Sequence, residues 1–281
     1  MTILYAVLGA IFNTGNDLVY RRSAVAKPTG EIITFYFFAS AASVPLAAIV
    51  AVAYTGTLTD GIGELFFGVA LGGLSFGAYL ALLLSLAHGS ASVAVTIFRL
   101  NIIPAIILAN ALQMETINLK RSIAVALCVT SIILLVGGGS QKERRETLRR
   151  QLISVCACLL GGAATFCNKI AMTEGYAPSR LLFWRFLTVA VITGMYLSIG
   201  KSWHLSRDHA KYAPLSGFFM CAALYIILEA LRLGDLSVVM PITQLSFVFL
   251  TLISWILLRE RVTLRKGIGS ALAIAVVILI A

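Results

Sequence analysis

The chain has 281 residues, of which 59% are hydrophobic and only 12% are charged, and its formal net charge is +10 at pH 7. Soluble domains carry about 25% charged residues, so this composition excludes an ordinary soluble protein. The apolar residues form long runs, as membrane-spanning helices require. The basic residues lie in short loops between these runs, which indicates membrane topology rather than a nucleic-acid partner.

Ten apolar runs are long enough to cross a bilayer. In chain order they cover residues 2–20, 32–54, 62–86, 91–113, 119–137, 151–173, 179–199, 212–231, 236–258 and 264–281. The most charged stretch, SQKERRETLRR at 140–150, separates the fifth run from the sixth. We therefore predict an all-α polytopic membrane protein whose ten transmembrane helices form two five-helix repeats, residues 1–137 and 151–281, joined by a cytoplasmic linker over 138–150.

The first run carries several polar residues. It has no basic leader and contains Asn13, Asn16 and Asp17, so we predict a membrane helix rather than a cleavable signal peptide. Asp17 could reach the interface, or it could couple transport to protons or cations. Arg21 and Arg22 follow closely and favour the ionised carboxylate. A proton carrier must instead titrate near the working pH, so we expect coupling not to depend on Asp17.

The third run is rich in glycine at helical spacing. These residues are Gly68, Gly72, Gly73 and Gly77. Such small-residue pairs let a neighbouring helix approach closely, and Gly161 and Gly162 have the same role in the sixth run. We predict close packing at both places, with a sliding surface in a moving transporter as the alternative.

Arg99 lies near the middle of the fourth run, beside Asn101. A charge at the bilayer centre costs at least about 2.5 kcal/mol, so it needs a partner or a function. Its guanidinium could clamp a substrate carboxylate or phosphate through two parallel hydrogen bonds. It could equally form a buried pair with Glu229 or Asp17, or reach a water-filled cleft.

The segment 81–137 recurs as 226–281 under a constant shift of 145 residues, without a gap. Matched positions include Gly89 and Gly234, Ser92 and Ser237, Arg99 and Gln244, Asn101 and Ser246, and Glu115 and Glu260. The first and sixth runs match more faintly, with Asn16 opposite Asn168 and Asp17 opposite Lys169, a lysine expected to snorkel. Five helices per half place the repeats upside down relative to each other, so matched mid-helix residues can converge on one cavity.

Further polar and aromatic residues lie on the later runs. Arg185, in LLFWRF, is expected to face the lumen or the other half, and Glu229 is expected to pair with Arg232 at the interface. Tyr79 and Tyr225 could line a pocket for a flat ligand by stacking, or lie in the core with one satisfied hydroxyl. The candidate substrate-binding residues are Arg99, Asn101, Gln244, Ser246, Tyr79, Tyr225, Asn13, Asn16 and Asn168.

The loop charges predict the orientation in the membrane. Loops after the odd-numbered helices carry most of the lysines and arginines, including the 138–150 linker. The alternate loops carry only Lys120, Arg121, Arg180 and Arg232. The positive-inside rule therefore places both termini outside the cytoplasm. The adjacent Lys120 and Arg121 run against this trend.

The sequence offers little support for catalysis. The five cysteines lie inside apolar runs, and His88, His204 and His209 lie in predicted loops. An intramembrane enzyme would need a nucleophile with a base, or a metal set, at membrane depth, and a channel would need a continuous polar stripe. There is no nucleotide-binding P-loop. We expect a transporter driven by gradients or by its substrate, with no catalytic residue, metal or cofactor.

The repeat and its junctions resemble the drug/metabolite transporter superfamily, in particular its ten-helix EamA-type members. The resemblance covers essentially the whole chain. It rests on ALLLSLAHGSASVAVTIFRLNIIP and its echo ALRLGDLSVVMPITQLSF, and on the junctions METINLKRSIA and RERVTLRKGIG. The E-x(6)-G signature is complete from Glu260 to Gly267, whereas Ser122 replaces the glycine in the first copy. The P-x(6)-R opening is present as Pro178 to Arg185, and Phe35 stands where the first copy would have arginine.

The resemblance implies both architecture and function. A central cavity would be lined mainly by helices 1, 3, 4, 6, 8 and 9 of the ten, with helices 5 and 10 behind them. Within the superfamily the chain looks most like bacterial exporters of aromatic amino acids and some cationic drugs, of the YddG type. This resemblance implies a multi-pass protein of the bacterial inner membrane. The expected partners are a small-molecule substrate and the lipid bilayer, the expected oligomeric state is a monomer, and another small metabolite is the alternative substrate.

Overall fold

The computed structural model describes residues 1–24, 29–88, 97–115, 118–136, 148–200, 203–204, 206–246 and 248–249, with isolated positions up to residue 279. Within these residues every regular element is a helix, which confirms the all-α prediction. The helices are α1 (Thr2–Ala24), α2 (Thr29–Thr55), α3 (Ile62–His88), α5 (Ile102–Ala111), α6 (Leu119–Val136), α7 (Leu148–Thr173), α8 (Pro178–Ile199), α9 (Arg207–Leu233) and α10 (Leu236–Thr243). Most of the tenth predicted run, 264–281, and the linker up to residue 147 lie outside the described residues.

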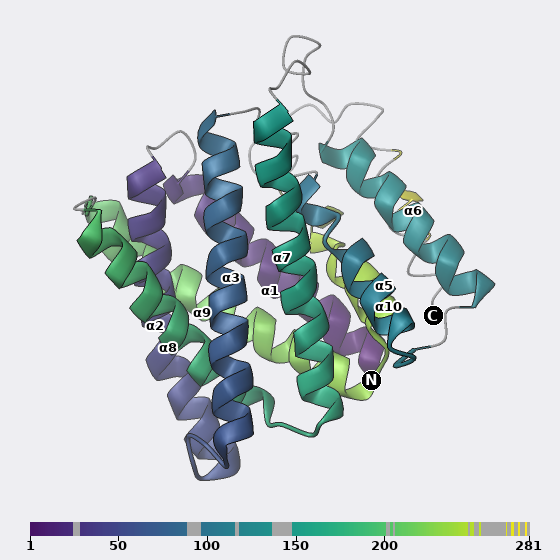
Figure 1. Cartoon of the computed structure of the whole chain (residues 1–281), viewed down its shortest axis with the longest axis horizontal. Helices are drawn as coiled ribbons and strands as arrows, with labels where there is room; N and C mark the ends of the chain where they lie inside the picture. Colours follow the sequence, from purple (N-terminus) through teal and green to yellow (C-terminus); the bar gives the residue numbers. More distant parts are fainter. Residues whose placement is uncertain are drawn as a thin grey trace.

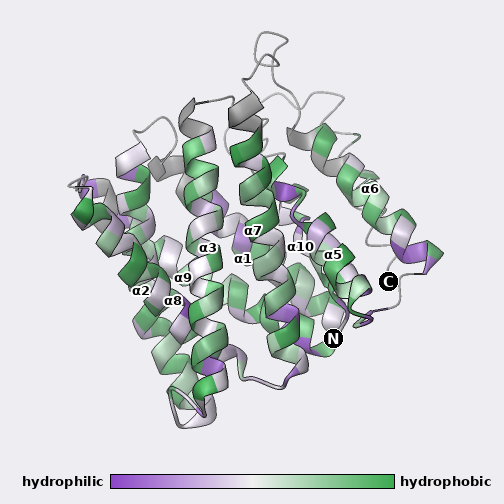
Figure 2. Cartoon of the chain, in the orientation of Figure 1, coloured by the Kyte–Doolittle hydropathy of each residue, from purple (hydrophilic) through white to green (hydrophobic). Residues whose placement is uncertain are grey.

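Several helices are built to cross a membrane. Five described helical stretches have sufficient length and hydropathy: Thr29–Thr55, Ile62–Ser85, Leu152–Thr173, Pro178–Ile199 and Lys211–Leu233. Their outer surfaces are apolar, and Ile49, Phe66 and Ile199 expose 65%, 67% and 81% of their surface. Figure 2 shows hydrophobic residues along the length of α3, α7 and α8. Because water would not favour such a surface, the chain is a multi-pass membrane protein, while the arrangement of ten helices stays a prediction.

The main interfaces join helices from the two halves of the chain. Helix α1 packs on α9, α2 packs on α8 and α9, and α3 packs on α7 and α8. In Figure 1, α2 and α8 lie side by side at the left, α3 and α7 in the middle, and α5 and α10 at the right. Among the described helices, the largest interfaces therefore join one half of the chain to the other.

Most of the glycines predicted to allow close packing do so, and Gly73 is the exception. A Cβ atom at Gly72 would lie 2.5 Å from Thr188 Cβ and 2.9 Å from the Arg185 carbonyl oxygen, so α3 and α8 touch there. At Gly73 nothing lies within 4 Å of such an atom. A Cβ at Gly162 would lie 2.6 Å from Pro104 Cγ, which brings α7 against the start of α5. The close-packing interpretation is confirmed at both places.

Candidate functional site

The fourth predicted run is interrupted at its centre. Residues 97–99 are helical, a turn follows at Leu100 and Asn101, and α5 then begins at Ile102. Pro104 explains the change, because it has no N–H to donate to the carbonyl of Leu100 four residues earlier. That carbonyl instead accepts from the N–H of Ile103, at 2.9 Å. The prediction of an uninterrupted helix over 91–113 is therefore wrong at this turn.

The ninth predicted run is interrupted at the matching place. Helix α10 ends at Thr243, and a turn covers Gln244 and Leu245. The N–H of Leu245 donates to the carbonyl of Ile242 at 3.0 Å, three residues back instead of four. Pro241 lies inside α10 just before this turn. Under the 145-residue shift the two turns coincide to within one residue, so the two matched segments are interrupted at nearly the same position.

Side chains from the two interruptions and from α1 meet in one polar cluster, which consists of Arg99, Gln244 and Asp17. Arg99 Nη2 lies 3.2 Å from Asp17 Oδ2 on α1, and Arg99 Nη1 donates to Gln244 Oε1 at 3.4 Å. The side chains of Arg99 and Asp17 are 17% and 21% exposed, so the pair is largely shielded from solvent. Of the alternatives raised for Arg99, the pair with Asp17 is the one formed in this structure. Glu229 pairs with Arg232 at 2.8 Å, as expected for that pair.

Asp17 thus forms one of the two ion pairs that the sequence suggested for Arg99. The expectation of an ionised carboxylate relied on Arg21 and Arg22, whose side chains lie outside the described part of the chain. The cation that contacts Asp17 is Arg99, which follows 82 residues later. Snorkelling towards the interface is therefore not the role of Asp17 in this structure.

Two buried polar atoms without a hydrogen-bond partner lie at the two interruptions. Among the described residues, Asn101 Oδ1 and Ser246 Oγ are buried without a hydrogen-bond partner. The hydroxyl of Thr14, on α1 one turn before Asp17, donates to the Ser246 carbonyl at 3.1 Å. Leaving a buried polar atom unpaired costs about 1–3 kcal/mol, so such atoms indicate a place for a ligand or water. Thr14 was missed from sequence, although its spacing from Asp17 places both on one helix face.

The remaining candidates fall into other groups. Asn168 accepts from Arg185 Nη1 at 3.4 Å, which places Arg185 against α7 of its own half. Asn16 accepts from the hydroxyl of Ser216 on α9 at 2.7 Å. The two asparagines matched by the repeat therefore have different partners. Asn13 is half-buried on α1, next to Thr14.

The two candidate tyrosines do not share one pocket. Tyr79 on α3 stacks on Tyr36 of α2, with ring centroids 4.0 Å apart. Tyr225 on α9 packs against Tyr54, at 6.2 Å between centroids, and Tyr54 is 75% exposed at the end of α2. Tyr225 thus belongs to that end of the bundle, whereas Tyr79 lies in an aromatic pair between α2 and α3.

Lys169 does not snorkel as expected. Its ammonium donates to the carbonyls of Leu231, at 3.1 Å, and Gly234, at 2.7 Å, at the C-terminal end of α9. These carbonyls have no partner within the helix, and a positive charge is favourable at that end. Lys169 therefore joins α7 to the end of α9. Only the tertiary structure identifies this role, because the acceptors follow more than 60 residues later in the chain.

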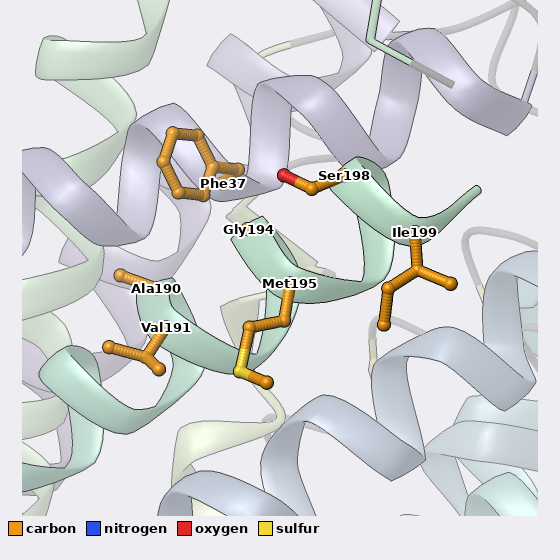
Figure 3. A pocket seen from close by; sticks show the side chains of 7 residues that line it. All are labelled: Phe37, Ala190, Val191, Gly194, Met195, Ser198 and Ile199. Carbon is orange, nitrogen blue, oxygen red and sulfur yellow. The ribbon is translucent and has the colours of Figure 1, made fainter. Parts of the chain in front are cut away.

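A separate groove lies on the outer face of α8. It has a volume of about 500 Å³ and is lined by Phe37, Ala190, Val191, Gly194, Met195, Ser198 and Ile199. Figure 3 shows Phe37 of α2 above the α8 residues, with Ser198 as the one polar side chain. Met195 is 59% exposed. The groove is lined almost entirely by apolar side chains, and none of the candidate substrate-binding residues is among them.

Metal ligands are not grouped in the described part of the chain, where no cluster of three or more His, Cys, Asp or Glu side chains could hold a metal ion. Two histidines predicted to lie in loops lie instead at helix ends. His88 is the last residue of α3, and His209 lies in the first turn of α9.

Comparison with known proteins supports a transporter. Residues 150–281 match the EamA-like transporter family. No curated protein matches the chain. A solved structure titled only "Crystal structure of protein" has the same fold, with a TM-score of 0.82 over 99% of this chain and 96% of that one, at 12% identity. The family match supports the resemblance to the drug/metabolite transporter superfamily, and it indicates a membrane transporter of small molecules, a class that is typically not enzymatic.

Proposed function

We propose that this protein is a secondary transporter that exports amino acids, aromatic or otherwise apolar, by alternating access around a cavity between two inverted five-helix repeats. The observation that carries the proposal is the group formed by Asp17, Arg99 and Gln244 at two matched helix interruptions. Transporters place their substrate sites at such discontinuous helices near the middle of the membrane.

The charges of this group suit a zwitterion. The Arg99 guanidinium can bind a carboxylate through two parallel hydrogen bonds, and Asp17 can accept from an ammonium. An amino acid that enters between them exchanges one ion pair for two, so no unpaired charge is left in a poorly solvated place. The unpartnered oxygens of Asn101 and Ser246 offer further hydrogen bonds.

The inverted repeat is proposed from two observations. The turns at Leu100–Asn101 and Gln244–Leu245 match under the shift found in the sequence. The ten apolar runs predict five helices in each half, which would invert one repeat relative to the other, and the loop charges favour both termini outside the cytoplasm. The end of the bundle that holds the N-terminus and the α2–α3 and α7–α8 connections, at the bottom of Figure 1, is then the extracytoplasmic end.

The kind of amino acid is proposed from an aromatic contact. The Tyr36–Tyr79 stack provides an aromatic surface on α3, which is consistent with an aromatic amino acid or a flat cationic drug. Another small metabolite that carries a carboxylate is the second candidate, because Arg99 alone could bind it.

Transport into proteoliposomes tests the proposal. The purified protein is offered labelled amino acids of each side-chain class, with and without a proton gradient. We expect saturable uptake of amino acids and competition between apolar members of the panel. Uptake that does not saturate would indicate a channel. Uptake of carboxylates without an amino group, and of no amino acid, would contradict the zwitterion site.

A further inference from the structure

Glu115 holds the start of a helix in the other half of the chain. It lies between α5 and α6, and its side chain is only 5% exposed. One carboxylate oxygen accepts from the backbone N–H of Leu236, and the other accepts from that of Ser237, at 3.0 Å. These N–H groups belong to the first turn of α10.

This contact replaces the local cap of α10. Asp235 stands at the N-cap position but makes no side-chain capping hydrogen bond. It pairs instead with Arg121 of α6, at 2.7 Å. The first N–H groups of a helix have no partner within it, and the positive end of the helix favours a carboxylate. The acceptor for the start of α10 therefore comes from the first half of the chain.

Helix α10 connects this contact with the candidate site. It has eight residues, a length of about 12 Å, and Gln244 follows directly after it. Gln244 accepts a hydrogen bond from Arg99. A displacement of the start of α10 away from Glu115 would thus move the residue that contacts Arg99.

Other contacts close the same end of the bundle. Lys169 binds the carbonyls at the end of α9, and Thr2 donates to the Leu233 carbonyl at 3.1 Å. Arg180 of α8 contacts the buried Glu64 of α3 at 2.8 Å. Glu115 differs from these residues because it is buried, charged and bound to the helix that leads to Gln244.

We propose that Glu115 is a positioning residue that acts as a latch: its two hydrogen bonds to α10 hold the extracytoplasmic end closed, and they break when that end opens. This inference rests on alternating access and on the orientation given under the proposed function. While the latch is formed, α10 is fixed to the first half and Gln244 stays beside Arg99. When the latch breaks, water solvates both the carboxylate and the free N–H groups of α10.

Thiol labelling measures the opening directly. Ser246 is fully buried, so Ser246→Cys in a protein whose five native cysteines are replaced reacts only when a path to it opens. Intact cells are treated from outside with a membrane-impermeant thiol reagent. In this background we expect Glu115→Gln to raise the labelling rate about tenfold, because hydrogen bonds to a charged acceptor are roughly twice as strong as those to a neutral one.

Two matched variants serve as controls. Glu229→Gln removes an acid from the same end of the bundle, where its partner is Arg232 and not α10. Glu260→Gln changes the acid at the repeat-related position, which the predicted topology puts on the cytoplasmic side. Neither should raise labelling from outside. An unchanged rate in Glu115→Gln, or an equal rise in Glu229→Gln, would overturn the latch.

A second variant keeps the test decisive if Glu115→Gln does not reach the membrane. Glu115→Asp retains the charge, but its side chain is too short to reach both N–H groups, so we expect labelling about threefold faster. A labelling rate equal to that of the parent would overturn the proposal. Labelling needs no substrate. Failure to transport amino acids would therefore reject the proposed function without affecting the latch. An unchanged labelling rate would reject the latch without affecting the proposed function.

Discussion

The two interrupted helices, residues 97–111 and 236–249, have the same backbone design and different chemistry. Each turns at the same position of the repeat, but the first presents Arg99 there and the second presents Gln244. Pro104 follows the first turn, whereas Pro241 precedes the second. Their supports also differ. Gly162 of α7 packs closely on Pro104, and Thr14 of α1 donates to the carbonyl of Ser246.

This difference shows how a symmetric scaffold can hold an asymmetric ligand. Two arginines at matched positions would repel each other at membrane depth, where each charge is costly. One arginine with a carboxylate partner from α1 lowers that cost and gives the site a positive and a negative side. Under the proposed function, a zwitterion would bind between these two charges in one orientation only.

The largest effect on uptake should come from replacing Arg99 by alanine, and the matched replacement of Gln244 should have a smaller one. We expect Arg99→Ala to lower uptake at least about 30-fold, because removing one partner of a shielded charge pair costs roughly 2–5 kcal/mol. Gln244→Ala should lower it less, because the hydrogen bond from Arg99 to Gln244 is long, at 3.4 Å, and Asp17 still pairs with the guanidinium. Initial rates of uptake in proteoliposomes measure both.

Arg99→Lys separates binding from folding. An ammonium cannot reproduce the two parallel hydrogen bonds, so KM should rise while the protein still inserts. The control is the double variant Asp17→Asn with Arg99→Gln, in which both charges are removed. If this double variant reaches the membrane while Arg99→Ala and Arg99→Lys do not, then Arg99 serves the structure and not the substrate.

Asp17→Asn tests the negative side of the site. We expect about tenfold weaker competition by amino acids, because a charge-assisted hydrogen bond to the ammonium becomes a neutral one. Competition by the matching acids without the amino group should change little. Equal losses for both ligands would mean that Asp17 only orients Arg99. Normal binding with loss of gradient-driven accumulation would instead make Asp17 the coupling site.

Glycine substitutions test the support of the first interruption. A Cβ at Gly162 would approach both Pro104 and the Asn101 carbonyl, so Gly162→Ala should destabilise the protein by about 1–3 kcal/mol. Gly73→Ala is the control, because the added methyl meets nothing within 4 Å and alanine favours a helix by roughly 0.5–1 kcal/mol. Thermal unfolding in detergent should show a lower midpoint for Gly162→Ala alone. A similar fall in both would contradict the packing argument.

The smallest effect should come from the prolines. Pro104→Ala supplies an N–H that can bond to the Leu100 carbonyl and straighten the first turn. One such bond contributes about 0.5–1.5 kcal/mol, so we expect the maximal rate to fall about two- to fivefold at a similar KM. Pro241→Ala lies before its turn and should change the rate less. If Pro241→Ala lowered the maximal rate more than Pro104→Ala, the second turn would matter more for transport than the first, which would contradict this prediction.

Much of the helical architecture was predictable because apolar length and loop charge are local properties. The runs at 32–54, 62–86 and 179–199 correspond to α2, α3 and α8. Arg99 and Gln244 were expected to converge because they match in the repeat, and their side chains are in contact. The interruptions were missed, although Pro104 and Pro241 marked them, because hydropathy does not report backbone hydrogen bonds.

The partners of the charged residues could not be derived in the same way. By itself the sequence determined that this chain forms apolar helices, that its second half repeats part of the first, and that Arg99 needs a partner or a function in the membrane. Only the tertiary structure decided that Arg99 contacts Asp17, that Lys169 binds the end of α9, and that Glu115 caps α10. The physical reason is that hydropathy accumulates along neighbouring residues, whereas a hydrogen bond depends on which distant segments the folded chain brings within about 3 Å.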